Sequence, residues 1–129
     1  MTTSGANWTI VSLGELAEFR NGLNFSKESY GSGLKVIGIP DFQDYVTPRY
    51  SELKEINPDG VATEEDLLHE NDILFVRSNG NRDLIGRSLF IKDLKGRVSF
   101  SGFTIRLRFH SKGVCPRFYA HLFLSLIHI

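Results

Sequence analysis

The stretch that most constrains the fold is residues 72–82, where an apolar run passes directly into a polar loop. Residues 73–76 read Ile-Leu-Phe-Val, four apolar residues rich in β-formers, which is typical of a strand buried on both faces. Asn79 and Gly80 follow, and this pair is a strong turn signal because both residues tolerate positive φ. The sequence therefore predicts a buried strand that ends in a polar turn.

The polar groups at and beyond this turn are those that bind nucleic acids. Arginine can bond guanine in bidentate fashion and asparagine can do the same with adenine, while hydroxyls and backbone groups contact phosphates. An equally good interpretation of the residues alone is a simple hairpin tip whose arginines pair with acids elsewhere in the chain. The candidate DNA-contacting residues are Arg77, Ser78, Asn79, Gly80, Asn81, Arg82, Arg87, Ser99, Ser101 and Arg106.

The formal net charge of zero conceals a marked asymmetry along the chain. Residues 1–76 contain 5 Lys and Arg against 13 Asp and Glu, whereas residues 77–129 contain 10 against 2. A basic half indicates an anionic partner, of which nucleic acid is the usual one. The alternative is that the two halves fold together and neutralise each other.

The pattern of elements predicts a mixed α/β (α+β) domain. Ser12 and Glu15 form a capping box that predicts a helix over residues 12–19. Residues 103–109 alternate between apolar and polar, largely basic side chains, which indicates a strand with one apolar and one polar face. We expect a twisted, mostly antiparallel sheet packed by an N-terminal and a C-terminal helix. Further strands are predicted at residues 8–11, 35–39, 84–91 and 98–100, a short helix at 63–68, and the C-terminal helix from Pro116.

Composition and motifs exclude several classes of protein. A chain of 129 residues is one domain or part of one. The single cysteine, Cys115, permits no internal disulfide, and the sequence shows neither a signal peptide nor a membrane span, so we expect a cytoplasmic protein. The sequence predicts no catalytic residue, metal or cofactor in this chain, because the four histidines lack metal-ligand spacing and nucleotide-binding and hydrolase motifs are absent.

Two alternatives remain open. One is a metal-dependent nuclease, because Pro40-Asp41 followed by Glu52 and Lys54 fits the spacing of a PD…E-x-K site, in which acids hold the metal beside a lysine. The apolar strand that should carry Glu52 and Lys54 is missing from the pattern. The other is a protein-interaction module whose basic half docks an acidic partner.

Four blocks of the chain together resemble the target recognition domain of the specificity subunit (HsdS-like) of type I restriction-modification enzymes. They are Leu-Gly-Glu-Leu-Ala-Glu-Phe with Asn-Gly-Leu-Asn-Phe at 13–25, Asn-Asp-Ile-Leu-Phe-Val-Arg-Ser-Asn-Gly at 71–80, Ile-Gly-Arg at 85–87, and Phe-Ser-Gly-Phe-Thr-Ile-Arg-Leu at 100–107. The resemblance implies a non-catalytic reader of double-stranded DNA, which directs separate methyltransferase and restriction subunits that use S-adenosylmethionine, ATP and magnesium. Related domains occur in single-chain restriction-modification enzymes, so a parent of either kind is implied.

The resemblance also implies how the chain is divided. Residues 1–116 are expected to be a single recognition domain, itself incomplete, and residues 117–129 the start of a connecting helix that is cut short. Residues 124–129 match the translation of a transposase adaptor used in sequencing libraries. One hypothesis is a reading frame that ran off a genomic fragment, and the alternative is an amphipathic helix whose partner is missing.

Overall fold

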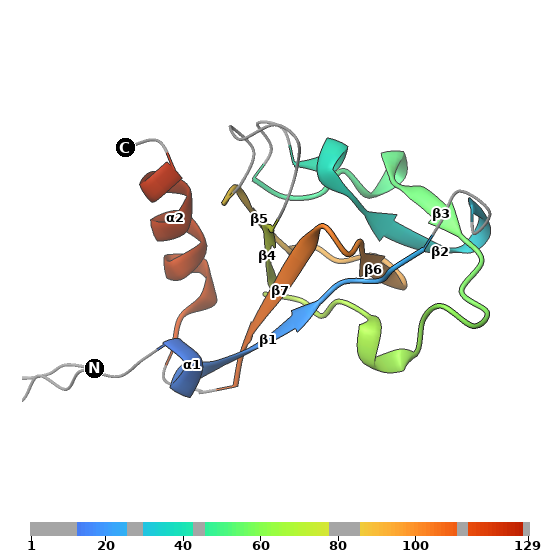
Figure 1. The fold of residues 1–129 in the computed structure, drawn as a ribbon. Helices are drawn as coiled ribbons and strands as arrows, with labels where there is room; N and C mark the ends of the chain where they lie inside the picture. Colours follow the sequence, from blue (N-terminus) through green and yellow to red (C-terminus); the bar gives the residue numbers. More distant parts are fainter. Residues whose placement is uncertain (1–12, 26–29, 43–45, 78–85, 111–113, 128–129) are drawn as a thin grey trace, which may run out of the picture.

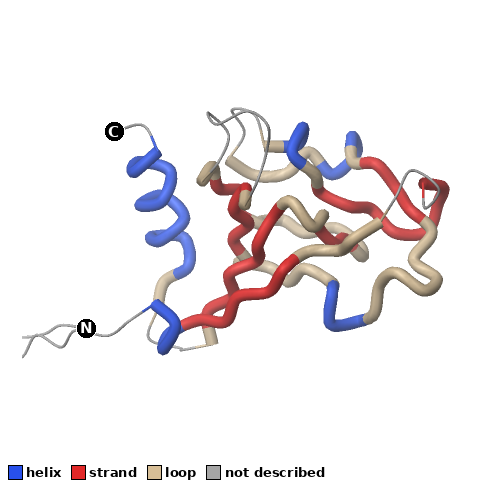
Figure 2. The backbone as a smooth tube through the Cα atoms, in the orientation of Figure 1, coloured by secondary structure: helices blue, strands red, loops and turns tan. Residues whose placement is uncertain are grey.

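The computed structural model describes residues 13–25, 30–42, 46–77, 86–110 and 114–127 (Figures 1 and 2). Within these ranges the chain forms a mixed α+β fold, as the sequence predicts. Three short 3-10 turns, η2 (Ile39–Asp41), η3 (Tyr50–Glu52) and η4 (Glu64–Asp66), connect the larger elements. Those elements are α1 (Leu13–Leu16), β1 (Ala17–Asn21), β2 (Tyr30–Ile37), β3 (Lys54–Ile56), β4 (Ile73–Val76), β5 (Ser88–Phe90), β6 (Val98–Phe100), β7 (Thr104–Phe109) and α2 (Pro116–Ile127).

The strands form two sheets rather than the one that the sequence predicts. The first has four antiparallel strands in the order β1-β7-β4-β5. The second has the order β3-β2-β6, with β3 antiparallel and β6 parallel to β2. In Figure 1 helix α2 lies on one side of the four-stranded sheet and strands β2 and β3 lie on the other. The expectation of mostly antiparallel pairing is confirmed.

Strand β4 occupies the middle layer and is covered on both faces, as its apolar run predicts. Ile73 packs with Leu107 of β7 and Ala120 of α2. Leu74 and Val76 face the other way, into the larger core between the two sheets. Burying each such side chain stabilises the fold by about 1.5–3 kcal/mol, so β4 is a rigid support for whatever follows it.

The predicted N-terminal helix over residues 12–19 is wrong beyond Leu16. Residues Ala17–Asn21 form β1, whose backbone pairs with β7 in a register that sets Glu18 opposite Arg108. Ala17 is 3% exposed and joins the core beneath α2. Sheet pairing and burial together outweigh the modest helix propensity of this segment.

The structure also changes other predicted boundaries. The predicted strand over residues 84–91 is observed as Ser88–Phe90 among the described residues, and Gly86 before it has φ +89°. The predicted helix over residues 63–68 is the single turn Glu64–Asp66. The predicted strand at residues 8–11 lies outside the described part of the chain. No helix that the structure describes is long and apolar enough to cross a membrane.

Candidate nucleic-acid interface

The two sheets are joined where the chain passes from β6 to β7, at residues 101–103. The backbone N–H of Ser101 donates to the carbonyl of Ile37 in one sheet (2.9 Å), and that of Gly102 donates to the carbonyl of Leu23 (2.7 Å). The hydroxyl of Thr104, the first residue of β7, donates to the carbonyl of Ser101 (2.8 Å). The β6–β7 connection is therefore held from both sides.

Two glycines allow this close approach. A Cβ added at Gly22 would lie 1.9 Å from the carbonyl oxygen of Ser101, and one at Gly102 would lie 2.6 Å from Oδ1 of Asn24. Any larger residue at Gly22 would push the two backbones apart. Segments 21–24 and 101–103 thus touch because neither glycine has a side chain.

A cleft of about 770 Å³ opens at this junction. Its walls come from residues 23–25, β2, η2, η3, β3 and the β6–β7 connection. Its charged lining consists of Asp41, Arg49, Glu52, Lys54 and Arg77, and its aromatic lining consists of Phe25, Tyr30 and Phe103. The remaining walls are largely aliphatic, and include Leu23, Val36 and Ile56.

Arg77, one of the predicted DNA-contacting residues, lies at the edge of this cleft. It follows β4 directly, and its backbone N–H donates to the carbonyl of Phe103 (2.7 Å). Its exposed guanidinium donates from Nη1 to Oδ1 of Asn21 (3.3 Å). The buried strand and these two bonds present a cation to solvent, and Phe103 lines the same cleft.

The acids of the cleft are already engaged. Glu52 pairs with Arg49 (2.7 Å), and Oδ2 of Asp41 accepts the backbone N–H of Gly38 (2.8 Å). Burial raises the pKa of the Asp41 carboxyl above its ordinary value, although the Gly38 bond and the charge of Arg49 oppose that change. Lys54 lies with Nζ 5.4 Å from the centre of the Tyr30 ring, a cation–π contact. The lining is thus mixed in charge.

The structure distributes the other predicted contact residues differently. Ser78, Asn79, Gly80, Asn81 and Arg82 lie outside the described residues. Arg87 is partly exposed, and its carbonyl accepts the N–H of Val76 (2.9 Å), which places it across from the end of β4. Ser99 is 0% exposed and its hydroxyl donates to the carbonyl of Asp66, while Ser101 is 6% exposed. The two serines therefore lie inside the domain.

Arg106 is also internal, contrary to the polar open face that the sequence predicts for residues 103–109. It is 3% exposed and donates to the carbonyl of Glu65 and to Oε1 of Glu18, both at 3.2 Å. Its buried Nε has no hydrogen-bond partner. Burial and the neighbouring charge of Arg108 lower the pKa of the Arg106 guanidinium. A DNA contact from Ser99, Ser101 or Arg106 stays a prediction that requires these side chains to be uncovered.

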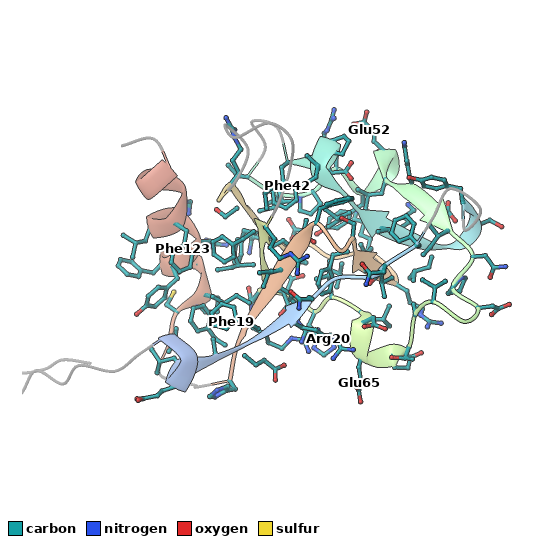
Figure 3. The ribbon with its side chains drawn as sticks, in the orientation of Figure 1. Phe19, Arg20, Phe42, Glu52, Glu65 and Phe123 are labelled. Carbon is teal, nitrogen blue, oxygen red and sulfur yellow. The ribbon has the colours of Figure 1, made fainter. Side chains whose placement is uncertain are left out.

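Arg108 and Asp72 complete this internal group. Arg108 donates from Nε and Nη2 to the two carboxylate oxygens of Asp72 (2.9 and 2.8 Å), and these bonds raise the pKa of the guanidinium. Asp72 is 1% exposed. We refer to Glu18, Asp72, Arg106 and Arg108 as the β7 ionic cluster. In Figure 3 Glu52 of the cleft lies at the top, whereas Arg20 and Glu65, which border the cluster, lie at the bottom.

Part of the positive charge of the second half is thus neutralised by acids of the first half within the domain. Arg106 pairs with Glu18 and Arg108 with Asp72, and on the surface Arg97 pairs with Glu64 (2.8 Å). Each pair joins a cation of the second half to an acid of the first, as the neutralisation alternative requires. Arg77 differs, because its side chain bonds an amide oxygen rather than a carboxylate.

Sequence reasoning missed four residues of the candidate interface, which are Asn21, Asn24, Tyr30 and Phe103. Asn21 lies just beyond the helix predicted over residues 12–19, and Phe103 belongs to the apolar face of the strand predicted over residues 103–109. In the structure Phe103 is 59% exposed and Asn21 holds Arg77. The available signal was the pair of glycines, Gly22 and Gly102, since glycine within an extended segment often marks close backbone contact.

Comparison with solved structures defines the class of fold. The HsdS subunit from Thermoanaerobacter tengcongensis matches 92% of this chain with a TM-score of 0.66 and 16% sequence identity, over 27% of its own length. The S subunit of the type I restriction-modification system from M. genitalium matches 92% of the chain with a TM-score of 0.56 and 14% identity, over 26% of its length. The fold is therefore that of part of an S subunit.

The sequence comparison points the same way. The type I restriction enzyme StySPI specificity subunit of Salmonella potsdam is 30% identical over 116 residues, which are 89% of this chain and 25% of that protein. No family model matches the chain. The chain is thus HsdS-like along nearly its whole length, and it spans about a quarter of the relatives it matches. The resemblance found in the four sequence blocks is confirmed.

Proposed function

We propose that this chain is a DNA-reading domain of a type I specificity subunit. It recognises a sequence in double-stranded DNA and so directs methyltransferase and restriction subunits to their target. Those subunits carry the chemistry together with S-adenosylmethionine, ATP and magnesium, and this chain carries none. The observation that supports the proposal most is Arg77, an exposed guanidinium at the edge of an open cleft in an HsdS-like fold.

The geometry supports a model in which β4 is a rigid support and Arg77, at its end, contacts the DNA. Strand β4 is packed on both faces, so its end moves little relative to the core. Arg77 presents a planar fork of donors, which suits the two acceptors of a guanine edge or a phosphate. The Asn21 amide limits the rotation of that fork. Residues 78–82 follow in sequence and supply the amides and the hydroxyl that the sequence predicts for base contacts.

The direct test is Arg77→Ala in a gel-shift titration against a duplex that the unmodified chain selects from a random pool. Loss of one bidentate base contact costs about 1–3 kcal/mol, so we expect affinity to fall about tenfold or more and the base preference to relax. Arg97→Ala is the matched control, because Arg97 is also an exposed arginine but pairs with Glu64 and does not line the cleft. Equal affinities and preferences for Arg77→Ala, Asn79→Ala and the unmodified chain would refute the proposal.

Salt dependence separates DNA reading from the alternative of a protein-interaction module. Each phosphate contact releases counterions, so DNA affinity should fall steeply as salt is raised. If Arg77 contacts a phosphate, its removal should reduce the slope of log affinity against log salt by about 1. Weak DNA binding that hardly responds to salt would favour the interaction module.

One observation keeps the nuclease as a second candidate. Asp41, Glu52 and Lys54, which the sequence links only by spacing, all line the same cleft. Against this candidate, Asp41 and Glu52 already have partners, and within the described ranges no three His, Cys, Asp or Glu side chains are grouped to hold a metal ion. Magnesium-dependent cleavage of plain duplex DNA, lost in Asp41→Asn, would support the nuclease and contradict our proposal.

A further inference from the structure

Phe103 is a large apolar side chain that stays mostly exposed among the residues that the structure describes. Its exposed fraction is 59%, and it occupies the tip of the β6–β7 connection, next to Arg77. The connection beneath it is anchored on both sheets by the bonds of Ser101, Gly102 and Thr104. An exposed phenylalanine on so firm a support is a suitable wedge. Proteins that deform DNA insert such apolar side chains between base steps.

The cleft behind Phe103 has the size and lining of a nucleobase site. Its volume of about 770 Å³ falls within the usual range for pockets that enclose small ligands. Tyr30 is 46% exposed and meets Phe25 edge to face, with ring centres 5.9 Å apart. A base can stack on such rings whatever its identity, because every base has a π-face. The aliphatic side chains of the walls offer apolar contacts to the rest of the ring.

Polar groups in the same cleft suit the edge of a base and its backbone. The Asp41 carboxylate, of which Oδ2 accepts the Gly38 N–H, and the Asn24 amide both line the cleft, and together they offer acceptors and donors to a base edge. Arg77 at the edge and Lys54 near Tyr30 are the cations that an attached phosphate requires. Apolar, polar and cationic groups thus occur together, as a nucleotide demands.

We propose that this cleft binds one nucleobase displaced from a DNA duplex, with Phe103 as the wedge that takes its place in the stack. This inference rests on the proposed DNA-reading function and adds a pocket to it. Displacement costs the energy of unstacking and unpairing, which is lowest for a base that is already unpaired. Stacking of the base in the cleft and of Phe103 in the gap offset that cost.

The test uses the full chain and two short duplexes that differ by one extra, unpaired thymine at the centre. The unmodified chain should bind the bulged duplex about tenfold more tightly than the paired one, because no base has to be unstacked. Permanganate oxidises an unstacked thymine, so the bound chain should protect the extra thymine from oxidation. Tyr30→Ala should abolish both the preference and the protection.

Phe103→Ala separates the wedge from the pocket. It should weaken binding to the paired duplex about tenfold and spare the bulged duplex, in which the base is already displaced. Phe118→Ala is the matched control, because Phe118 is exposed to the same 59% but lies on α2 and does not line the cleft. Thermal melting verifies that each variant folds.

Three results would overturn the inference. Equal affinity for the two duplexes, or a thymine that the bound chain leaves reactive, would contradict the pocket while DNA reading survives. Equal behaviour of Phe103→Ala and Phe118→Ala would contradict the wedge. If the unmodified chain binds neither duplex, the proposed function fails and the inference fails with it.

Discussion

Arginines of the basic second half of the chain lie in opposite environments in this domain. Arg106 and Arg108 on β7 lie in the β7 ionic cluster, at 4% and 23% side-chain exposure, with carboxylates as partners. Arg77 lies one strand away, at the end of β4, and its guanidinium reaches solvent. The difference arises from position: β7 lies between β1 and β4 and faces acids of the first half, whereas Arg77 follows the last residue of β4. The basic composition of the second half therefore does not predict which arginines are exposed and which are buried in ion pairs.

Energetics separate the two groups further. Desolvation makes a buried ion pair a weak source of net stability, but removal of one partner leaves a buried charge without compensation. An exposed arginine can be removed at little cost to the fold. The β7 ionic cluster should therefore control stability and Arg77 should control DNA affinity, and this separation can be tested.

The largest effect is expected for Arg108→Met. The substitution leaves the Asp72 carboxylate, which is 1% exposed, without its bidentate partner. We expect the free energy of unfolding to fall by about 3–5 kcal/mol, measured by urea denaturation. Arg77→Ala should change it by less than about 0.5 kcal/mol.

The double variant Arg108→Met, Asp72→Asn is the control for this prediction. It removes the uncompensated charge and keeps an oxygen acceptor for the N–H of His69 (2.7 Å in the native chain). A substantial part of the lost stability should return. Similar losses for Arg108→Met and Arg77→Ala would show that the two groups of arginines do not differ as we argue.

The second largest effect is expected for Gly22→Ala, which tests the junction that supports Arg77. The new Cβ would lie 1.9 Å from the Ser101 carbonyl oxygen, a backbone atom that cannot rotate away. Overpacking of this kind costs about 1–3 kcal/mol, and it should also lower DNA affinity because Asn21 and the cleft wall shift. Gly31→Ala is the control, since the nearest atom to its Cβ lies 4.0 Å away. Calorimetry and gel shift measure the two effects.

The contrast between the two groups explains what the sequence could and could not predict. The apolar run of β4, the strand of β7 and the start of α2 at Pro116 follow from local patterns, and the structure confirms them, although the polar face predicted for β7 is buried at Thr104 and Arg106. Local patterns did not reveal that Ala17–Asn21 is a strand, because the strand it pairs with, β7, is far away in the sequence. Because the sequence predicts a helix there, it does not indicate that Glu18 lies opposite Arg108. The β7 ionic cluster could therefore not be predicted.

The interface was concealed for a related reason. Its edge forms where residues 21–24, 77 and 101–103 meet. These segments are far apart in the sequence, so no single segment carries a periodic pattern that predicts their contact. Phe103 begins an alternating segment, so the pattern alone assigns it to the apolar face. The structure shows that β7 starts one residue later, at Thr104, which leaves Phe103 in the exposed turn.

Asp66 and Asp41 should affect the stability of the domain in opposite ways as the pH changes, because their pKa values are shifted in opposite directions. Partial burial alone would raise the pKa of Asp66, but hydrogen bonds from Thr63 and Arg20 outweigh it and hold the pKa below its ordinary value. Its contribution to stability is therefore present above the unfolded-state pKa and is lost as the pH falls below about 4. Asp66→Asn should destabilise the domain at pH 7 and flatten the acid side of the stability profile.

Asp41 in the cleft should behave in the opposite way. Burial raises its pKa, so its ionised form costs stability in the folded state, and stability declines as the pH rises through the folded-state pKa. Asp41→Asn should therefore be at least as stable as the unmodified chain at pH 7, with the amide oxygen still accepting the N–H of Gly38. Thermal melting from pH 3 to 8 compares both variants. Destabilisation of both at pH 7 would contradict the opposite assignments.

The smallest effect on the fold is expected for Asn21→Ala, and it isolates how Arg77 is held. The bond from Arg77 to the Asn21 amide is exposed and 3.3 Å long, so its loss should change the free energy of unfolding by less than about 0.5 kcal/mol. DNA affinity should nevertheless fall by a few fold, because the guanidinium loses its orientation. In a double-mutant cycle on DNA affinity, Asn21→Ala should have no further effect once Arg77 is alanine. Additive losses of affinity would mean that Asn21 contacts DNA by itself. The exposed DNA-contacting residues would then include the Asn21 amide as well as the Arg77 guanidinium.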